Sequence, residues 1–326
     1  MLKNATSKAI PETPENASKL LIIRSGCALA RHPLLHLSGL YRFRTLAVAA
    51  FSRPSIEMMQ NTSQTDTILI DPIRAQAMHK SLGHQGDGPK TGDPLPHFWH
   101  WGQFWTVIGP EGSGRDGHPQ LGGFIPDLGL PRRMWAGGNL RFERPLRIGQ
   151  EATRTSRIMN VTQKTGRSGP LAFVKVEHLV SSADGPCFRE EQDLVYREDP
   201  SADQLTPPTK TARRDEKHRE SYTVSTTDLF RYSALTFNGH RIHYDLDYAR
   251  DVEGYPGLVT HGPLLAQRLI EMAERHLGTL THFSFQAVAP LFHFESFEAC
   301  SAPTETGLEL WIRGEDGRLN MIASAI

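Results

Sequence analysis

The feature that most constrains this chain is one long amphipathic helix among segments that alternate polar and apolar residues. Between residues 262 and 276, apolar side chains recur every three or four positions, as at Leu265, Leu269 and Met272. Such a helix needs a sheet to cover its apolar face, and the strand-like segments after residue 283 supply one. The sequence therefore predicts an antiparallel sheet wrapped around a helix, in the α+β class. The residues expected on the solvent face are Gln267, Arg268, Glu271, Glu274 and Arg275.

The same alternation occurs in two separate parts of the chain. In the first part, residues 172–180 place four apolar side chains on one face, whereas Lys175 and Glu177 point the other way. Residues 141–163 predict two more strands. In the second part, residues 308–325 predict a hairpin that turns at residues 314–317. The chain of 326 residues is long enough for about two domains.

Composition divides the chain further. We expect an N-terminal half at residues 59–198, a proline-rich and charged linker at 199–220, and a C-terminal half at 221–326. We expect order to begin near Asp71, where Asp71-Pro72 predicts the start of a short helix that ends at Gly83. Residues 1–58 have the basic, Ser- and Ala-rich composition of a transit peptide over most of their length. Glu12, Glu15 and several prolines oppose that interpretation, so an extension that does not fold stays open.

Charge and cysteine content exclude several classes of protein. Lys+Arg and Asp+Glu are both 36, which leaves no basic excess for nucleic acid. No run of apolar residues approaches the roughly 18 needed to cross a membrane. The three cysteines lie far apart and form neither a disulfide framework nor a metal knuckle.

A glycine-rich segment at residues 112–117 matches the dinucleotide-binding pattern GxGxxG. The pattern requires a helix immediately afterwards, whose N-terminus binds the pyrophosphate. Here Pro119, a Gly-Gly pair and Pro126 follow instead, so no such helix begins there. We therefore reject a dinucleotide site.

The densest group of side chains capable of acid–base chemistry or metal binding lies between Arg231 and His261. Imidazole and carboxylate side chains are metal ligands as well as acid–base groups. The spacing of His240 and His243 lacks the i, i+4 helical pair of common zinc hydrolases, so we favour acid–base chemistry and expect no metal. The group consists of His240, His243, Asp245, Asp247 and His261.

His243 is the best candidate for proton transfer, because Ile242 and Tyr244 flank it and limit the access of water. The segment before the long helix, His261-Gly262-Pro263, adds a second function. The backbone amide of Gly262 lies at the positive end of the helix dipole, where a carbonyl oxygen that becomes negative is stabilised.

Residues 91–326 resemble the MaoC-like hydratases and dehydratases of the hotdog superfamily. The resemblance is closest to the branch with the type 2 hydroxyacyl-thioester dehydratases and the itaconyl-CoA and mesaconyl-CoA hydratases. His243 falls at the catalytic histidine of the family motif, and 261–263 resembles the segment that binds the thioester carbonyl. Residues 94–104, 122–149 and 164–174 resemble the N-terminal hotdog of the same branch. The resemblance implies a double hotdog, an α+β fold with two antiparallel sheets, each wrapped around a central helix.

The chain departs from the family motif at one position. Asn238 stands where the family has its catalytic aspartate, and an amide cannot shuttle protons. We expect His243 to be the main acid–base group and Asn238 to orient water or substrate. Asp245, His240 or His261 is expected to supply the second proton relay.

The resemblance implies a hydro-lyase that adds water to an unsaturated acyl thioester or removes it from a 3-hydroxyacyl thioester. The alternative is a hotdog protein that binds or hydrolyses acyl thioesters without hydratase chemistry. The residues expected to contact substrate are His240, Tyr244, His261, Arg132, Arg133 and Trp135. Arg132 and Arg133, with Arg141 and Arg144 further along the same stretch, are expected to contact the phosphates of CoA or phosphopantetheine.

The resemblance also indicates partners and location. We expect no cofactor beyond the CoA or acyl-carrier-protein thioester itself, and a monomeric pseudo-dimer or a homodimer. The expected location is the cytoplasm, or the mitochondrial matrix if residues 1–58 are a transit peptide.

Overall fold

A computed structural model of the chain describes residues 62–166, 169–200 and 209–326, all of which belong to one compact unit. The segment 1–58 and most of the expected linker's first half, 201–208, lie outside the described residues.

In the part of the first half that the structure describes, there are five strands and one α-helix. Its strands follow the order β1-β3-β4-β5-β2 across the sheet, and all neighbours are antiparallel. The elements are β1 (Ser63–Leu69), α2 (Pro72–Ser81), the 3-10 turns η1 (Trp99–Gly102) and η2 (Pro110–Gly112), β2 (Arg132–Phe142), β3 (Glu151–Gly166), β4 (Gly169–Ser182) and β5 (Gly185–Arg197).

The second half repeats this topology in mirror order, β7-β10-β9-β8-β6. In each half the first strand lies at the outer edge of the sheet and the second strand at the centre. The elements are β6 (His218–Tyr222), α3 (Thr226–Leu235), the short helical turns η3 (Arg241–His243) and η4 (Tyr248–Val252), α4 (Gly262–Leu277), β7 (His282–Ala287), β8 (Phe297–Pro303), β9 (Leu308–Gly314) and β10 (Leu319–Ala325).

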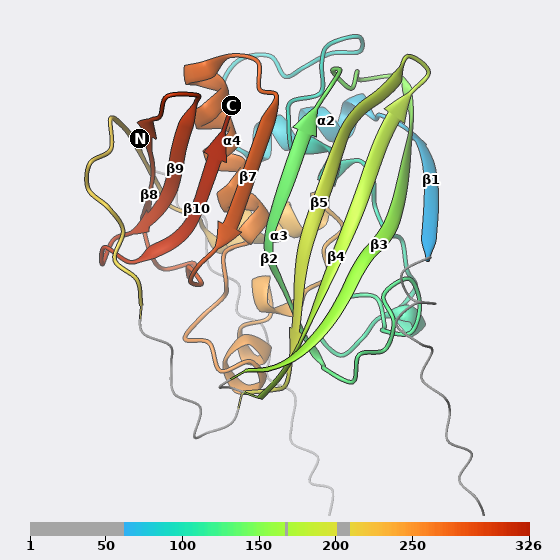
Figure 1. Cartoon of the computed structure of the whole chain (residues 1–326), viewed down its shortest axis with the longest axis vertical. Helices are drawn as coiled ribbons and strands as arrows, with labels where there is room; N and C mark the ends of the chain where they lie inside the picture. Colours follow the sequence, from blue (N-terminus) through green and yellow to red (C-terminus); the bar gives the residue numbers. More distant parts are fainter. Residues whose placement is uncertain (1–61, 167–168, 201–208) are drawn as a thin grey trace, which may run out of the picture. The chain divides into compact units, whose positions relative to one another are not determined.

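The two halves meet where β2 pairs with β7, from Gly137 opposite Gln286 to Arg141 opposite His282. Figure 1 shows the resulting continuous sheet, with the helices on the face behind it. The expected α+β double hotdog is confirmed. The two expected sheets are joined through β2 and β7 into one sheet of ten strands in the described part of the chain.

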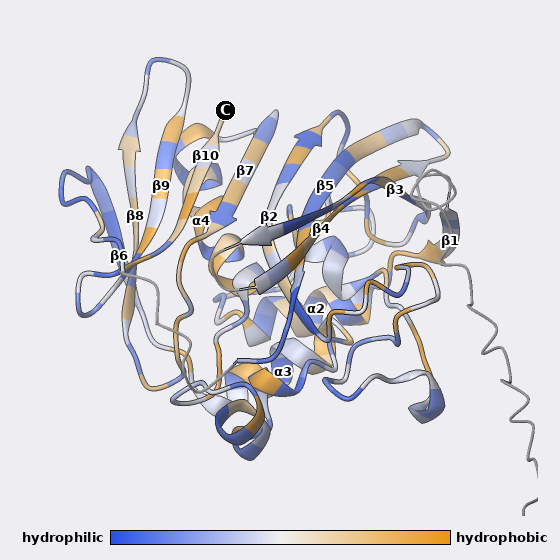
Figure 2. Cartoon of the chain, turned by 60° about the horizontal axis from the view of Figure 1, so that its bottom comes forward, coloured by the Kyte–Doolittle hydropathy of each residue, from blue (hydrophilic) through white to orange (hydrophobic). Residues whose placement is uncertain are grey.

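Helix α4 is the centre of the main core. Leu265, Leu269 and Met272 are buried, as their spacing predicts, and pack with residues of both halves. Figure 2 shows apolar and polar residues alternating along strands of the second half, which supply one wall of that core.

The expected solvent face of α4 is partly wrong. Gln267 and Glu271 are buried, because the segment after α2 covers this side of the helix. His84 Nε2 lies 3.1 Å from Glu271 Oε1, and the amide of Gln267 donates to the carbonyl oxygen of His97. Helix periodicity cannot reveal a cover that comes from a segment about 180 residues away in the chain.

Two expected boundaries shift. Order begins earlier than Asp71, because β1 pairs with β3 along the outer edge of the first half. Strand β6 begins at His218, inside the segment 199–220 that was expected to be linker, and pairs with β8. The short helix is confirmed: the Asp71 side chain caps α2 by accepting the N–H of Ile73, and Gly83 follows its end.

Among the described residues, none of the helices combines the length and hydropathy of a membrane-spanning segment. Cys187 and Cys300 are buried free thiols.

Candidate active site

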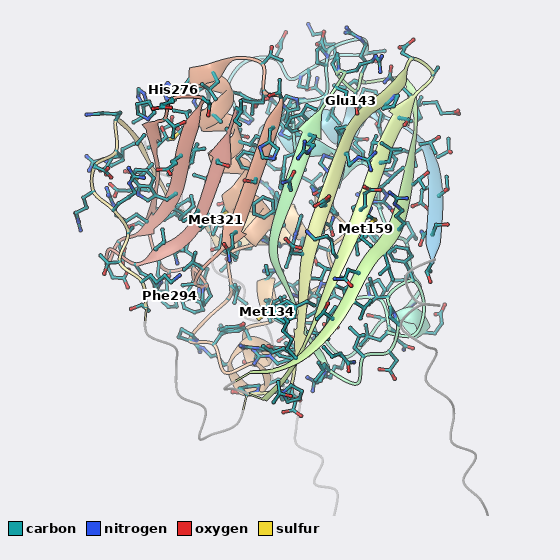
Figure 3. The ribbon with its side chains drawn as sticks, viewed as in Figure 1. Met134, Glu143, Met159, His276, Phe294 and Met321 are labelled. Carbon is teal, nitrogen blue, oxygen red and sulfur yellow. The ribbon has the colours of Figure 1, made fainter. Side chains whose placement is uncertain are left out.

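A cavity of about 760 Å³ is lined by residues of both halves. Its walls include the first residues of β2, the segment 104–119, the loop 237–244 and the start of α4. Figure 3 labels Met134 at the beginning of β2 and Met321 on β10, which both line it, whereas Glu143 lies just beyond the opposite end of β2. Most of the lining is apolar, so the few polar groups in it are the candidates for chemistry.

His243, in η3, lines this cavity and is buried. Its Nδ1 lies 2.8 Å from the carbonyl oxygen of Val259. Because a carbonyl oxygen only accepts, Nδ1 carries the proton, and Nε2 of the neutral ring is left as a base. Burial lowers the pKa of His243 to about 4, so the ring is neutral near pH 7.

His261 lies directly behind His243 and holds its ring. The two ring centroids are 3.7 Å apart in a stacked arrangement, and His261 Nε2 lies 2.8 Å from Ser233 Oγ on α3. His261 is fully buried and does not line the cavity, so the expectation that it contacts substrate is wrong. Burial, with a smaller effect of His243, lowers the pKa of His261 well below its usual value, which leaves the ring an uncharged support.

Gly262 opens α4 at the cavity wall. Its backbone N–H has no acceptor among the described residues, as is typical of the first turn of a helix. A Cβ at this position would meet nothing within 4 Å, and the residue lines the cavity. The protein therefore leaves free space beside a helix N-terminal donor, which suits a ligand oxygen.

Asn238 also lines the cavity, in the turn after α3. Its Oδ1 accepts the backbone N–H of His240, at 3.1 Å, and the preceding residue Phe237 has a left-handed φ of 50°. The side-chain NH₂ has no partner among the described residues. This assignment of oxygen and nitrogen follows from the neighbour, because a backbone N–H can only donate.

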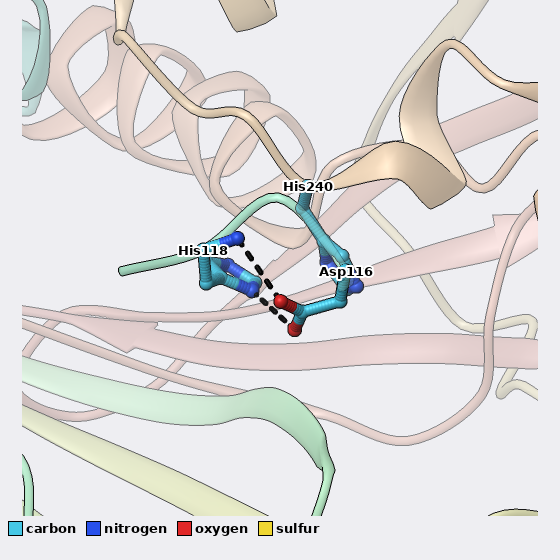
Figure 4. Close-up of side chains that lie close together, drawn as sticks. All are labelled: Asp116, His118 and His240. Carbon is cyan, nitrogen blue, oxygen red and sulfur yellow. Dashed lines mark hydrogen bonds and ion pairs between the residues drawn. The ribbon is translucent and has the colours of Figure 1, made fainter. Parts of the chain in front are cut away.

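His240 lines the cavity beside a pair from the first half, Asp116 and His118. His118 Nδ1 lies 2.9 Å from Asp116 Oδ2, while Asp116 Oδ1 accepts the N–H of His118 (Figure 4). The rings of His118 and His240 are 4.3 Å apart, and those of His240 and His243 are 5.3 Å apart. Asp116 and His118 gave no separate signal in the sequence, because residues 112–117 match only the rejected dinucleotide-binding pattern.

Two glycines bring these loops together. A Cβ on Gly117 would lie 1.8 Å from the carbonyl oxygen of Gly239, and one on Gly239 would lie 2.5 Å from that of Gly117. Gly117 also has a φ of 88°, which favours glycine. The N–H of Arg241 donates to the carbonyl oxygen of Asp116, at 2.9 Å. The two loops therefore touch backbone to backbone, at positions that admit no side chain.

The side chains of the two adjacent arginines of β2 lie in different environments. Arg132 is buried, pairs with Glu253 and does not line the cavity, so the expectation that it binds substrate is wrong. Arg133 lines the cavity and has no ionic partner among the described residues. Trp135 lines it as well, and its Nε1 donates to the carbonyl oxygen of Gly137.

Asp245 is turned away from the site. Its carboxylate accepts two hydrogen bonds from Arg241, at 3.0 and 2.7 Å, and the N–H of Tyr248. It does not line the cavity, so the expected relay through Asp245 has no path to substrate. Tyr244 does line the cavity, and its hydroxyl donates to the carbonyl oxygen of Gly239.

One part of the cavity wall carries unused donors. Trp101, Arg154 and Gln192 all line it, and each has a buried N–H without a partner among the described residues: Trp101 Nε1, Arg154 Nε and Gln192 Nε2. Arg154 keeps its other nitrogens on Asp66 and on the carbonyl oxygen of Phe104. A buried donor without an acceptor costs free energy, so this region favours a ligand that brings oxygen atoms.

Structural comparison shows the fold. A MaoC-like dehydratase from Phytophthora capsici aligns with a TM-score of 0.61 at 12% sequence identity, over 83% of this chain and 98% of that one. HtdX of Mycobacterium tuberculosis aligns with a TM-score of 0.57 at 16% identity, over 80% of this chain and 99% of that chain.

Sequence comparison shows the family. The model of the hydroxyacyl-thioester dehydratase type 2 family matches residues 96–293. The mesaconyl-C(4)-CoA hydratase of Chloroflexus aurantiacus is 42% identical over 83% of this chain and 98% of its own length. A mitochondrial hydroxyacyl-thioester dehydratase type 2 of Schizosaccharomyces pombe is 28% identical over 64% of this chain and 77% of its own length. The chain therefore belongs to the hydroxyacyl-thioester dehydratase type 2 family, whose members are hydro-lyases.

Proposed function

We propose that this enzyme adds water to, or removes it from, a short acyl-CoA thioester that carries a free carboxylate, with His243 as base and Gly262 as oxyanion donor. The observation that carries the proposal is the arrangement of two groups on one cavity. His243 has its Nδ1 proton fixed on Val259, which leaves Nε2 as the base, and the Gly262 N–H is free beside space for a ligand.

Hydration of an enoyl thioester needs both groups. His243 Nε2 takes a proton from water as the water oxygen bonds to the β-carbon. The electrons of the double bond move toward the thioester carbonyl, whose oxygen becomes negative and accepts the Gly262 N–H. Asn238 orients the water or the carbonyl through its unused NH₂ group. The enolate then takes a proton at its α-carbon, which completes the addition of water, and the reverse sequence of steps removes water from a 3-hydroxyacyl thioester.

The polar groups of the cavity support the carboxylate. Arg133 brings a guanidinium without an ionic partner, and Trp101, Arg154 and Gln192 bring unused donors. A carboxylate would satisfy either set, whereas a plain hydrocarbon chain would leave both unpaired. The name of the Chloroflexus aurantiacus relative indicates a substrate of this type, since mesaconate esterified at one end keeps a second carboxylate.

An assay with three thioesters tests the proposal. Water addition to mesaconyl- and crotonyl-CoA is followed by loss of the enoyl-thioester absorbance, and that to itaconyl-CoA by chromatography of the product. Released thiol is measured in parallel. We expect hydration without thiol release, and a higher kcat/KM for the two carboxylated substrates than for crotonyl-CoA. Thiol release without hydration would make the protein a thioesterase and overturn the proposal.

The variant Arg133→Gln locates the carboxylate. If Arg133 binds it, the preference for mesaconyl-CoA over crotonyl-CoA falls, whereas a contact of Arg133 with the CoA phosphates lowers kcat/KM for both substrates equally. An unchanged preference would place the carboxylate on the donors of Trp101, Arg154 and Gln192. Arg141→Gln is the matched control, since Arg141 lies on the same strand, is exposed and does not line the cavity.

The carrier of the acyl group, the oligomeric state and the cellular location are also proposals. We propose CoA rather than acyl carrier protein as the carrier, no resident cofactor, and a monomer or homodimer, which sedimentation distinguishes. We propose a cytoplasmic location, with the mitochondrial matrix as the alternative, since two related dehydratases are named mitochondrial. Import of a reporter fused to residues 1–58 decides between the two.

A further inference from the structure

We propose that His118, held by Asp116, is the second acid–base group of the reaction and exchanges the proton at the α-carbon. This inference rests on the proposed function. It fills the position that Asn238 leaves open, since the amide that replaces the family aspartate cannot carry a proton. The group comes from the first half of the chain, far in sequence from the family motif.

The geometry gives His118 a fixed tautomer. Asp116 accepts the Nδ1–H at 2.9 Å and the backbone N–H at 3.0 Å, so the ring is oriented by a carboxylate. His118 lines the cavity, and Nε2 is the ring nitrogen without a protein partner among the described residues. A carboxylate bonded to one imidazole nitrogen orients the ring and stabilises its protonated form.

The two histidines then have different roles. His243 donates only to a neutral carbonyl, which suits a base, whereas His118 donates to a carboxylate, which suits an acid. In hydration, His243 takes a proton from water as the C–O bond forms, and His118 gives its Nε2 proton to the α-carbon as the enolate electrons return. A proton that passes from His243 to His118 by way of solvent or His240 restores both groups, and the net change is the addition of one water.

The charges around His118 connect this role to the substrate. The pKa of His118 lies below its usual value, because burial and the charge of Arg133 lower it and the hydrogen bond and charge of Asp116 offset only part of that effect. His240, on the facing loop, is held neutral by burial, and His118 and His243 add to that effect. An acyl carboxylate paired with Arg133 would compensate the positive charge of the guanidinium and so raise the pKa of His118. An anionic substrate would therefore favour the protonated acid that its own reaction needs.

A metal ion is the alternative occupant, because side-chain atoms of Asp116, His118 and His240 lie within 4.8 Å of one another. The hydrogen bond to Asp116 removes His118 Nδ1 as a ligand but leaves Nε2 free to bind a metal, so the two occupants are separated by experiment. Dialysis of the wild-type enzyme against a chelator decides. We expect full activity afterwards. Loss of activity that Zn²⁺ restores would overturn the inference.

The main test measures kcat/KM for mesaconyl-CoA against pH in the wild type, His118→Gln and Asp116→Asn. We expect His118→Gln to lose about 10²–10⁴-fold, the usual contribution of a general acid or base. The fall of the rate at high pH, where the acid loses its proton, should disappear in His118→Gln and move to lower pH in Asp116→Asn. The control His276→Gln, an exposed residue that does not line the cavity, should keep the wild-type profile.

The outcomes separate this inference from the proposed function. Absence of hydration by the wild-type enzyme would overturn the proposed function. An active wild type together with a fully active, folded His118→Gln variant would overturn the role of His118 alone. A lowered rate in His118→Gln with an unchanged pH profile would also overturn it, because a purely structural role lowers the rate without removing a titrating group.

Discussion

The two halves of the molecule share one strand topology and differ in the lengths of their helices and strands. In the second half, α4 has 16 residues, and the neighbouring strands β8, β9 and β10 have seven each. In the first half, α2 has only 10 residues, whereas β3, β4 and β5 have 16, 14 and 13. A short helix under long strands leaves part of the sheet face uncovered by that helix.

The chemistry follows this difference. His243 lies in η3 and Gly262 is the first residue of α4, and the hydrogen bond of His243 to Val259 fixes the orientation of its ring. The first half supplies cavity wall from its strands, at Arg133, Arg154 and Gln192, and one loop that reaches across to His240. The second half thus supplies the proposed base and the oxyanion donor, and the first half supplies acyl-pocket wall together with the loop that carries His118.

The largest expected effect is on the reactive group of the second half. His243→Ala should lower kcat/KM by about 100-fold or more, because it removes the base and leaves the pocket in place. Circular dichroism and thermal unfolding check that the variant is folded. Near-normal turnover in a folded variant would show that the second half does not hold the base.

Stability should fall in acid through one buried histidine in each half. Burial lowers the pKa of His178, on β4, and of His243 to about 4, so the unfolded chain binds protons that the folded chain does not below the usual value of 6.5. The contribution of each ring to the free energy of unfolding is therefore fully present above about pH 6.5. About 3 kcal/mol of it is lost for each ring as the pH falls toward 4. Urea unfolding at several pH values measures this. A midpoint that is the same at pH 7 and pH 4.5 would contradict it.

Gly117→Ala tests the contact between the halves. The new Cβ would collide with the carbonyl oxygen of Gly239, and the left-handed φ disfavours alanine. We expect a loss of about 2 kcal/mol in unfolding free energy, with a lower kcat/KM because the His118 and His240 loops separate. Gly122→Ala is the matched control, since it shares a left-handed φ but meets nothing within 4 Å. Equal effects of the two variants would show that backbone strain alone matters.

Asn238 gives the smallest effect. Asn238→Ala should lower kcat/KM by about 10-fold, the scale of one hydrogen bond to the reacting groups, while Asn238→Asp should keep some activity and add an acidic limb to the pH profile. Losses of stability in proportion to activity would instead show that the side chain only holds the turn at His240. A fully active and stable Asn238→Ala would remove the residue from the site.

The spacing of apolar residues predicted the elements whose structure depends on residues close together in the chain. The spacing of Leu265, Leu269 and Met272 and the alternation of residues 308–325 predicted α4 and the β9–β10 hairpin, because the period of apolar residues along one segment determines which face is buried. The polar edge strand β1 carries no apolar face, and its residues gave no signal.

The site was predictable only where a motif marks it. His243, Asn238 and Gly262 lie within one stretch that resembles a family motif, and the structure brings all three to the cavity. Asp116 and His118 lie in a glycine-rich loop some 120 residues earlier, and backbone contacts of this loop with Gly239 and Arg241 place them there. Arg132 and Arg133 look equivalent in sequence, yet alternation along β2 directs one to Glu253 and the other to the cavity.

The most direct test of a single site shared by both halves is a double-mutant cycle on the hydration of mesaconyl-CoA. Rates are measured for the wild type, His118→Gln, His243→Ala and the double variant. If the two histidines act on one reaction, the double variant should be about as slow as the slower single variant, because groups that act as a unit are not additive. Losses that multiply would show that the two residues act independently and would contradict a shared site.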